Sequence, residues 1–125
     1  MPFLVISNLA NYEFGSANIT TIEEALCGAI IKIPELGLTE KEISFSFPQD
    51  PSSESGEVDV LIEVELLLDK PGRTTAVREK MARAICSAFV NATNNYRRRV
   101  EVSIPPFHPE RDGFASFTPP NLSLE

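Results

Sequence analysis

The sequence predicts an α+β fold made of tandem duplicated β-α-β units, which form a four-stranded mixed sheet with two helices on one face. Three pairs of short segments match one another at a constant offset of 59 residues. The matching segments are residues 3–6 with 62–65, 25–30 with 84–89, and 42–45 with 101–104. Because the matches fall in a strand, a helix and a second strand in that order, they indicate an internal duplication with a pseudo-two-fold axis.

The first unit begins with an apolar run at residues 3–6, which predicts a short buried strand. Thr20 or Thr21 then opens a helix, since Thr21 and Glu24 have the spacing of a capping box. Apolar side chains recur along this helix at Ile22, Leu26, Ala29, Ile30 and Ile33. Residues 42–47 alternate polar and apolar side chains, as in a half-buried strand.

The second unit holds the strongest strand pattern of the chain, at residues 57–68. The alternating side chains expected on its buried face are Val58, Val60, Ile62, Val64 and Leu66. Thr74 or Thr75 caps the second helix. The apolar stripe of that helix is Val77, Met81, Ala84, Ile85, Ala88 and Phe89. A fourth strand is marked by Val100, Val102 and Ile104. A helical crossover makes the two strands within each unit parallel.

Length and composition limit the possible classes of protein. The 125 residues fit one domain, 1–125, with pseudo-repeats at 2–48 and 61–107 and a C-terminal arm at 108–125. A net charge of −7 argues against nucleic acid as a partner. No apolar segment is long enough to span a bilayer, and none has the form of a signal peptide, so we expect a cytoplasmic protein without membrane contact. The two cysteines lack metal-ligand spacing, and we expect neither a metal nor a cofactor.

Several strings carry a resemblance to a known superfamily. Pro2 directly follows the initiator methionine, and residues 60–89, with their Gly-Arg-Thr turn, resemble the strand–turn–helix of 5-carboxymethyl-2-hydroxymuconate isomerase. The Phe-His-Pro string at 107–109 is similar to the C-terminal arm of that family. The turn at 70–73 also resembles that of the cis-3-chloroacrylic acid dehalogenase branch. With the doubled strand–helix–strand unit, these strings resemble the tautomerase superfamily over essentially the whole chain, with some likeness to macrophage migration inhibitory factor.

This resemblance implies that the secondary amine of Pro2 moves a proton between carbon and oxygen sites of an enol or keto acid. The amine is free only when Met1 has been removed, and apolar surroundings lower the pKa of such an amine. The residues implied to bind the substrate are Lys70, Arg73, Ser103 and Arg111. The predicted function is that of a proline-based isomerase or tautomerase that acts on a small unsaturated keto or enol carboxylate. The resemblance also implies a homotrimer, whose subunits would cover the sheet face opposite the helices.

Departures from the family pattern leave a second function open. Tautomerases usually carry an arginine on the strand after the first helix, whereas residues 42–46 contain no cation. Glu101 would oppose an anionic substrate, although Ser103 could donate a hydrogen bond to one. The alternative is a catalytically inactive tautomerase-fold protein, either a ligand-binding module or a structural protein. Because catalysis needs the free amine of Pro2, the chain can be an enzyme only if Met1 is removed.

Overall fold

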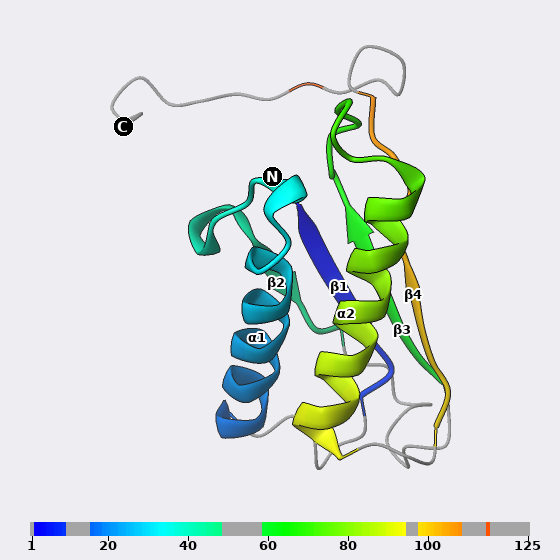
Figure 1. Ribbon diagram of the computed structural model, residues 1–125. Helices are drawn as coiled ribbons and strands as arrows, with labels where there is room; N and C mark the ends of the chain where they lie inside the picture. Colours follow the sequence, from blue (N-terminus) through cyan, green and yellow to red (C-terminus); the bar gives the residue numbers. More distant parts are fainter. Residues whose placement is uncertain (1, 10–15, 49–58, 95–97, 109–114, 116–125) are drawn as a thin grey trace.

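Two β-α-β units lie side by side in the computed structural model (Figure 1). The structure describes residues 2–9, 16–48, 59–94, 98–108 and 115. The first unit contains β1 (Phe3–Ser7), α1 (Ser16–Ile31), the short 3-10 helices η2 (Pro34–Leu36) and η3 (Glu40–Glu42), and β2 (Ser44–Ser46). The second unit contains β3 (Val60–Glu65), α2 (Thr75–Thr93) and β4 (Val100–Ser103).

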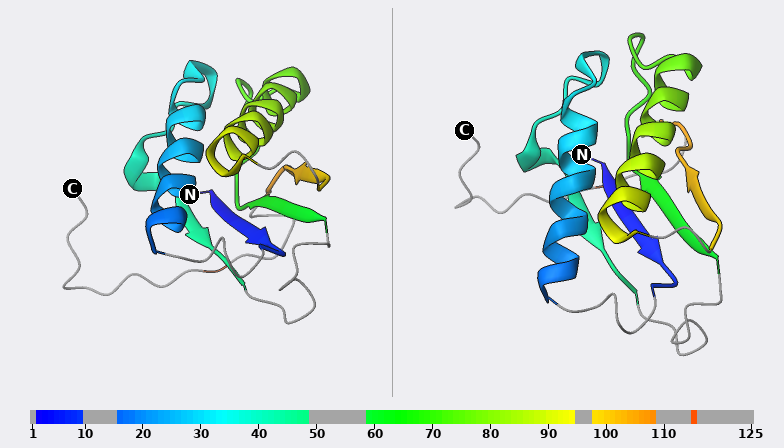
Figure 2. Two further views of the ribbon diagram at one scale, coloured as in Figure 1. Left: turned by 90° about the horizontal axis from the view of Figure 1, so that it is seen from below. Right: turned by 60° about the horizontal axis from the view of Figure 1, so that its bottom comes forward.

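The four strands form one mixed sheet in the order β2-β1-β3-β4. Within each unit the strands are parallel, as a helical crossover requires, and the central strands β1 and β3 are antiparallel. Figure 2 shows both helices on the same face of the sheet. The predicted fold class, a four-stranded mixed sheet with two helices on one face, is confirmed.

The hydrophobic core lies between this sheet face and the two helices. The sheet contributes Leu4, Ile6, Val60, Ile62 and Val64, each fully buried. The helices contribute two matching sets of buried side chains, Ile22, Leu26 and Ile30 from α1 and Met81, Ile85 and Phe89 from α2. These sets correspond at an offset of 59 residues, as the sequence predicted. The predicted cap of α2 is also confirmed, because Thr74 Oγ1 accepts a hydrogen bond from the Val77 N–H at 3.2 Å.

The offset of 59 residues is wrong in the first strand of each unit, β1 and β3. It would match fully buried Leu4 with exposed Glu63, although a one-residue slip moves a side chain to the other face of a sheet. Burial and backbone conformation instead correspond at an offset of 58 residues. The matching pairs are Leu4 and Ile62, Ile6 and Val64, Asn8 and Leu66, and Leu9 and Leu67. The first unit therefore has one fewer residue than the second between its strand and the core positions of its helix.

Two predicted segments differ from the observed elements at their ends. The first helix begins at Ser16, so Thr21 lies within it and cannot act as its N-cap. The strand predicted at 42–47 is limited to Ser44–Ser46, because Glu42 belongs to η3. None of the helices in the described part of the chain has the length and apolar character that a bilayer crossing needs.

The alternation had predicted that the buried face of β3 continues to Leu66. In the structure it does not. Leu66 adopts a left-handed conformation with φ 61° and is 37% exposed, whereas Leu67 is 1% exposed. A left-handed residue turns the chain, so the inward position moves one residue along. Asn8 and Leu9 repeat the same arrangement after β1, where Asn8 has φ 73°.

The core description predicts a large contrast between two apolar residues of α1. Leu26→Ala should lower the free energy of unfolding by about 2–5 kcal/mol, because the truncation leaves a cavity among buried side chains. Ile31→Ala should lower it by less than about 1 kcal/mol, since Ile31 is 43% exposed at the end of the same helix. Urea unfolding of both variants measures the difference, and similar losses would contradict this assignment of the core.

Candidate functional site

The start of β1, the loop after α1 and the turn between β3 and α2 lie at the same end of the molecule (Figure 1). Pro2 is buried at this end, and its carbonyl accepts a hydrogen bond from the Ser44 N–H at 3.2 Å. This bond fixes Pro2 against β2, the strand that pairs in parallel with β1. The predicted proton carrier is thus held on rigid strand backbone.

Arg73 fastens the turn between β3 and α2 to the loop after α1. Its side chain is 5% exposed, and it donates from Nη1 to the Leu68 carbonyl at 3.0 Å and from Nη2 to the Leu36 carbonyl at 2.7 Å. Its Nε is buried without a hydrogen-bond partner among the described residues. Burial lowers the pKa of Arg73, and the negative charge of Glu42 opposes this shift in part. The guanidinium is therefore engaged with backbone rather than open to solvent.

A surface hollow of about 420 Å³ lies beside this turn. Its lining residues are Asp69, Lys70, Pro71, Arg73, Thr74, Thr75 and Arg78. The structure thus brings together the two cations that the sequence predicted, and it adds Arg78, whose Nη1 donates to the Arg73 carbonyl at 2.6 Å. Lys70 is exposed. Pro2 lies at the same end of the molecule but does not line the hollow.

The sequence reasoning did not identify Glu42 as a residue of this region. Glu42 Oε1 accepts hydrogen bonds from the Thr39 N–H and the Thr39 Oγ1, both at 3.0 Å. The hydrogen bond from the Thr39 N–H has the largest effect on the Glu42 carboxyl and holds its pKa below the usual value. The hydrogen bond from the Thr39 hydroxyl and the positive charge of Lys70 lower this pKa further. Glu42 therefore places a negative charge within range of both predicted cations. The Thr-x-x-Glu spacing at 39–42, a capping box, was the signal that could have revealed it.

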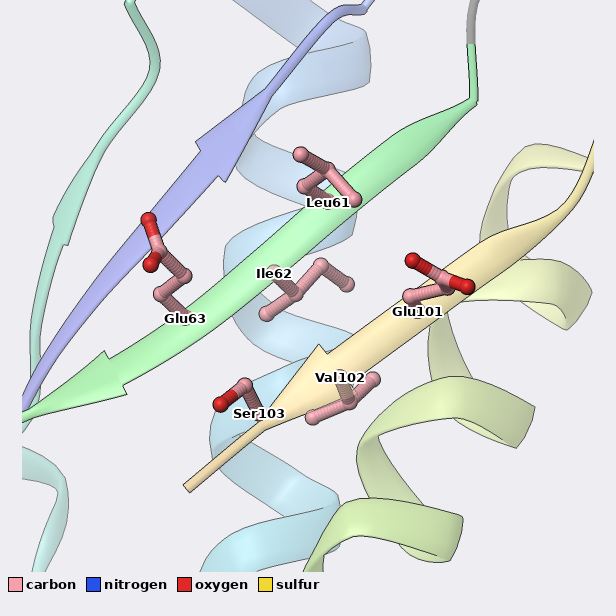
Figure 3. A pocket seen from close by; sticks show the side chains of 6 residues that line it. All are labelled: Leu61, Ile62, Glu63, Glu101, Val102 and Ser103. Atoms are coloured by element: carbon pink, nitrogen blue, oxygen red, sulfur yellow. The ribbon is translucent and has the colours of Figure 1, made fainter. Parts of the chain in front are cut away.

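Ser103 lies on the opposite face of the sheet, away from the helices. It lines a shallow groove of about 510 Å³ with Leu61, Ile62, Glu63, Glu101 and Val102. Figure 3 shows Leu61, Glu63, Glu101 and Ser103 on the near side of the strands, with Ile62 and Val102 behind them. Because β3 separates β4 from β1, the structure does not bring Ser103 to Pro2 within one chain.

The C-terminal arm is joined to the same turn where it leaves β4. His108 Nε2 lies 3.1 Å from Asp69 Oδ2, and Arg78 Nη1 lies 3.4 Å from Asp69 Oδ1. The backbone of Phe107 adds two hydrogen bonds, to Leu67 at 3.1 Å and from Asp69 at 3.0 Å. His108 thus joins the start of the arm to Asp69 of the turn. Arg111, the remaining predicted substrate-binding residue, lies outside the described residues.

The described region contains two cysteines and no group of side chains suited to a metal ion. Cys27 and Cys86 are free, and burial, followed by the charges of Glu40 and Glu23, raises the pKa of the Cys27 thiol. A raised pKa keeps the thiol protonated and unreactive. Within the described ranges, no three His, Cys, Asp or Glu side chains are grouped to hold a metal ion.

The buried guanidinium predicts that Arg73 contributes to stability. Arg73→Ala should lower the free energy of unfolding by about 3 kcal/mol, because it removes two hydrogen bonds from a charged donor to backbone carbonyls. Lys70→Ala, an exposed neighbour, should change it by less than about 0.5 kcal/mol. Denaturant titration of the two variants tests this role, and equal stabilities would exclude it.

The lowered pKa of Glu42 predicts a pH-dependent contribution to stability. A carboxyl that binds its proton less readily when folded stabilises the protein above its ordinary pKa of 4.5, and this contribution is lost as the pH falls through the lower folded pKa. Glu42→Gln should therefore be less stable than the wild type at pH 7 and similar to it near pH 3. Thermal unfolding at both values, with Glu35→Gln as the control, measures this, and a difference that persists at low pH would disprove it.

Comparisons with known proteins reveal similarity in structure only. No protein-family model matches the sequence, and no curated protein matches it. A fused 4-OT solved as an asymmetric trimer superposes with a TM-score of 0.67 and 13% identity, over 93% of this chain and 94% of that chain. Pt0534 inactivated by 2-oxo-3-pentynoate superposes with a TM-score of 0.66 and 15% identity, over 90% of this chain and 92% of that chain.

FG41 malonate semialdehyde decarboxylase inhibited by 3-bromopropiolate gives a TM-score of 0.60 and 18% identity, over 91% of each chain. These similarities extend over almost the whole length of both chains. The chain shares the fold of these tautomerase-superfamily proteins, as the sequence resemblance implied.

Proposed function

We propose that the chain is a cytoplasmic, proline-based isomerase or tautomerase that acts on a small unsaturated keto or enol carboxylate once Met1 is removed. The observation that carries this proposal is the position of Pro2, which is buried at the same end of the sheet as the cationic turn. The fold supports it, because one protein with the same fold is inactivated by 2-oxo-3-pentynoate, itself a 2-oxo compound.

The chemistry requires a base that is neutral near physiological pH. The secondary amine of Pro2 accepts a proton from one site of the substrate while the π electrons shift, and it returns a proton to another site. The reaction is therefore an isomerisation with no net gain or loss of atoms. An α-amino group titrates close to neutrality, and burial lowers its pKa, so the free Pro2 amine fits this role.

Lys70 is the side chain best suited to bind the substrate carboxylate. It is exposed beside the hollow, whereas the terminal nitrogens of Arg73 already donate to two carbonyls. In this proposal Arg73 shapes the turn and adds positive charge to the site. Ser103 and Arg111 would act across a subunit boundary in a homotrimer. The fused 4-OT proteins of the same fold, which form trimers, support that assembly.

The alternative is a binding or structural protein that keeps the fold without catalysis. The engagement of Arg73 with backbone favours this alternative, because that guanidinium does not face an incoming anion. The carboxylate of Glu42, held by Thr39 within range of Lys70, also opposes an anionic ligand. Under this alternative, Pro2 serves as a buried residue at the start of the strand.

Kinetics of Met1-free protein, verified by its intact mass, separate the two functions. Pro2→Ala should lower kcat by about 100-fold, because it replaces the positioned secondary amine. Lys70→Ala should mainly raise KM, by roughly tenfold for one lost charge-assisted contact. Ketonisation of phenylenolpyruvate and 2-hydroxymuconate provides the assay.

Lys80→Ala, which changes an exposed lysine of α2, is the matched control and should keep the wild-type rates. Equal activity in the wild type and in Pro2→Ala would assign Pro2 to the scaffold. Absence of turnover in correctly processed, folded protein would favour the alternative.

A further inference from the structure

The backbone of the C-terminal arm places His108 beside the turn between β3 and α2. Leu68 and Phe107 form a parallel bridge, and the Leu67 carbonyl accepts the Phe107 N–H at 3.1 Å. The Phe107 carbonyl in turn accepts the Asp69 N–H at 3.0 Å. These two hydrogen bonds align the arm with the turn, so that the His108 side chain meets that of Asp69.

Both carboxylate oxygens of Asp69 are engaged by segments outside the turn. His108 Nε2 lies 3.1 Å from Oδ2, and Arg78 Nη1 lies 3.4 Å from Oδ1. Arg78 is itself fixed, because the same nitrogen donates to the Arg73 carbonyl at 2.6 Å. The Asp69 carboxylate is therefore held by the arm through His108 and by α2 through Arg78.

Without these partners, the Asp69 carboxylate would compete with a ligand for Lys70. Asp69 and Lys70 are adjacent in sequence and line the same hollow. The ammonium group of a lysine lies at the end of a flexible four-carbon stem, so it can reach a neighbouring carboxylate. An ion pair between these two residues would occupy the accessible cation to which the proposed function assigns the substrate carboxylate.

Glu42, a second carboxylate close to Lys70, is engaged in a comparable way. Its Oε1 accepts two hydrogen bonds from Thr39, both at 3.0 Å. Glu42 and Asp69 thus each have donors of their own. Lys70 remains exposed although two negative charges lie close to it.

We propose that His108 is a positioning residue, which acts with Arg78 to keep the Asp69 carboxylate from pairing with Lys70. Lys70 is then free to bind the substrate carboxylate. The start of the C-terminal arm thereby sets the affinity of the hollow for anions, although His108 is not among the residues that line it. This inference rests on the proposed function, which assigns the substrate carboxylate to Lys70, and its test measures binding instead of turnover.

Calorimetry at pH 7 compares the affinities of the full-length chain for two probes. One is trans-cinnamate, a carboxylate, and the other is trans-cinnamamide, which has the same apolar body without the charge. His108→Ala releases Asp69 Oδ2, His108→Gln supplies an amide that can donate to it again, and Asp69→Asn removes the negative charge. Asp59→Asn is the matched control, because Asp59 is an exposed aspartate at the opposite end of β3.

His108→Ala should weaken trans-cinnamate binding about threefold, because the released carboxylate competes for Lys70, and His108→Gln should restore most of this loss. Asp69→Asn should strengthen trans-cinnamate binding about threefold, because the competing charge is gone. Adding His108→Ala to Asp69→Asn should have no further effect, since no carboxylate is left to position. Asp59→Asn should leave both affinities within about twofold of the wild type, and trans-cinnamamide binding should change no more than that in any variant.

The expected gain in Asp69→Asn cannot come from a damaged fold, so the two opposite effects separate positioning from a merely structural role. Asp69→Asn protein that binds trans-cinnamate no more tightly than the wild type would overturn the proposal. So would a His108→Ala variant that loses as much affinity for the amide as for the acid, or a wild type that binds the acid no better than the amide. If the variants behave as expected but Met1-free protein turns over neither enol, His108 stands as a positioning residue for anion binding and the isomerase function fails.

Discussion

The antiparallel pairing of β1 with β3 is the constraint on which the rest of the structure depends. Its register, with Phe3 opposite Glu65 and Ile6 opposite Ile62, decides which side chains of both units face the helices. Each unit alone has only two strands and one helix, too little to enclose a core. The central ladder joins the two half-cores into one. The start of β1 and the turn that carries Lys70 lie at the same end of the sheet.

At that end of the sheet, a buried charge lies among hydrophobic side chains such as Leu36 and Leu67. Arg73 connects the loop after α1 to the backbone after β3, and both of its partners are carbonyls. Carbonyl oxygens are suitable partners because they satisfy a guanidinium without adding a second buried charge. This arrangement makes Arg73 part of the scaffold and leaves Lys70 as the accessible cation of the pair that the sequence predicted.

Periodicity predicted the helices well, because each has a single apolar stripe that packs on the sheet. The matching of Leu26 with Ile85 was therefore legible in the sequence. The conformation of Leu66 was not, since a leucine in strict alternation gives no sign of a left-handed φ. The 59-residue offset failed in β1 and β3 for a different reason, because the first unit has one fewer residue between its strand and the core positions of its helix.

The candidate site was predicted less completely, for reasons that depend on distance along the chain. Glu42 and Thr39 form a local motif, which the sequence displays. The role of Arg73 depends on Leu36, 37 residues away, and no local pattern encodes that contact. Ser103 was chosen by analogy with relatives, and the strand order places it two strands from Pro2.

The wide separation of the partners of Arg73 also has a kinetic consequence. The central ladder and the Arg73 contacts join segments far apart in sequence, so chain entropy delays their formation until the loops between them have closed. Contacts that form after the folding transition state act mainly on the rate of unfolding. We expect the Arg73–Leu36 contact to form late in folding, so that its loss should speed unfolding more than it slows folding.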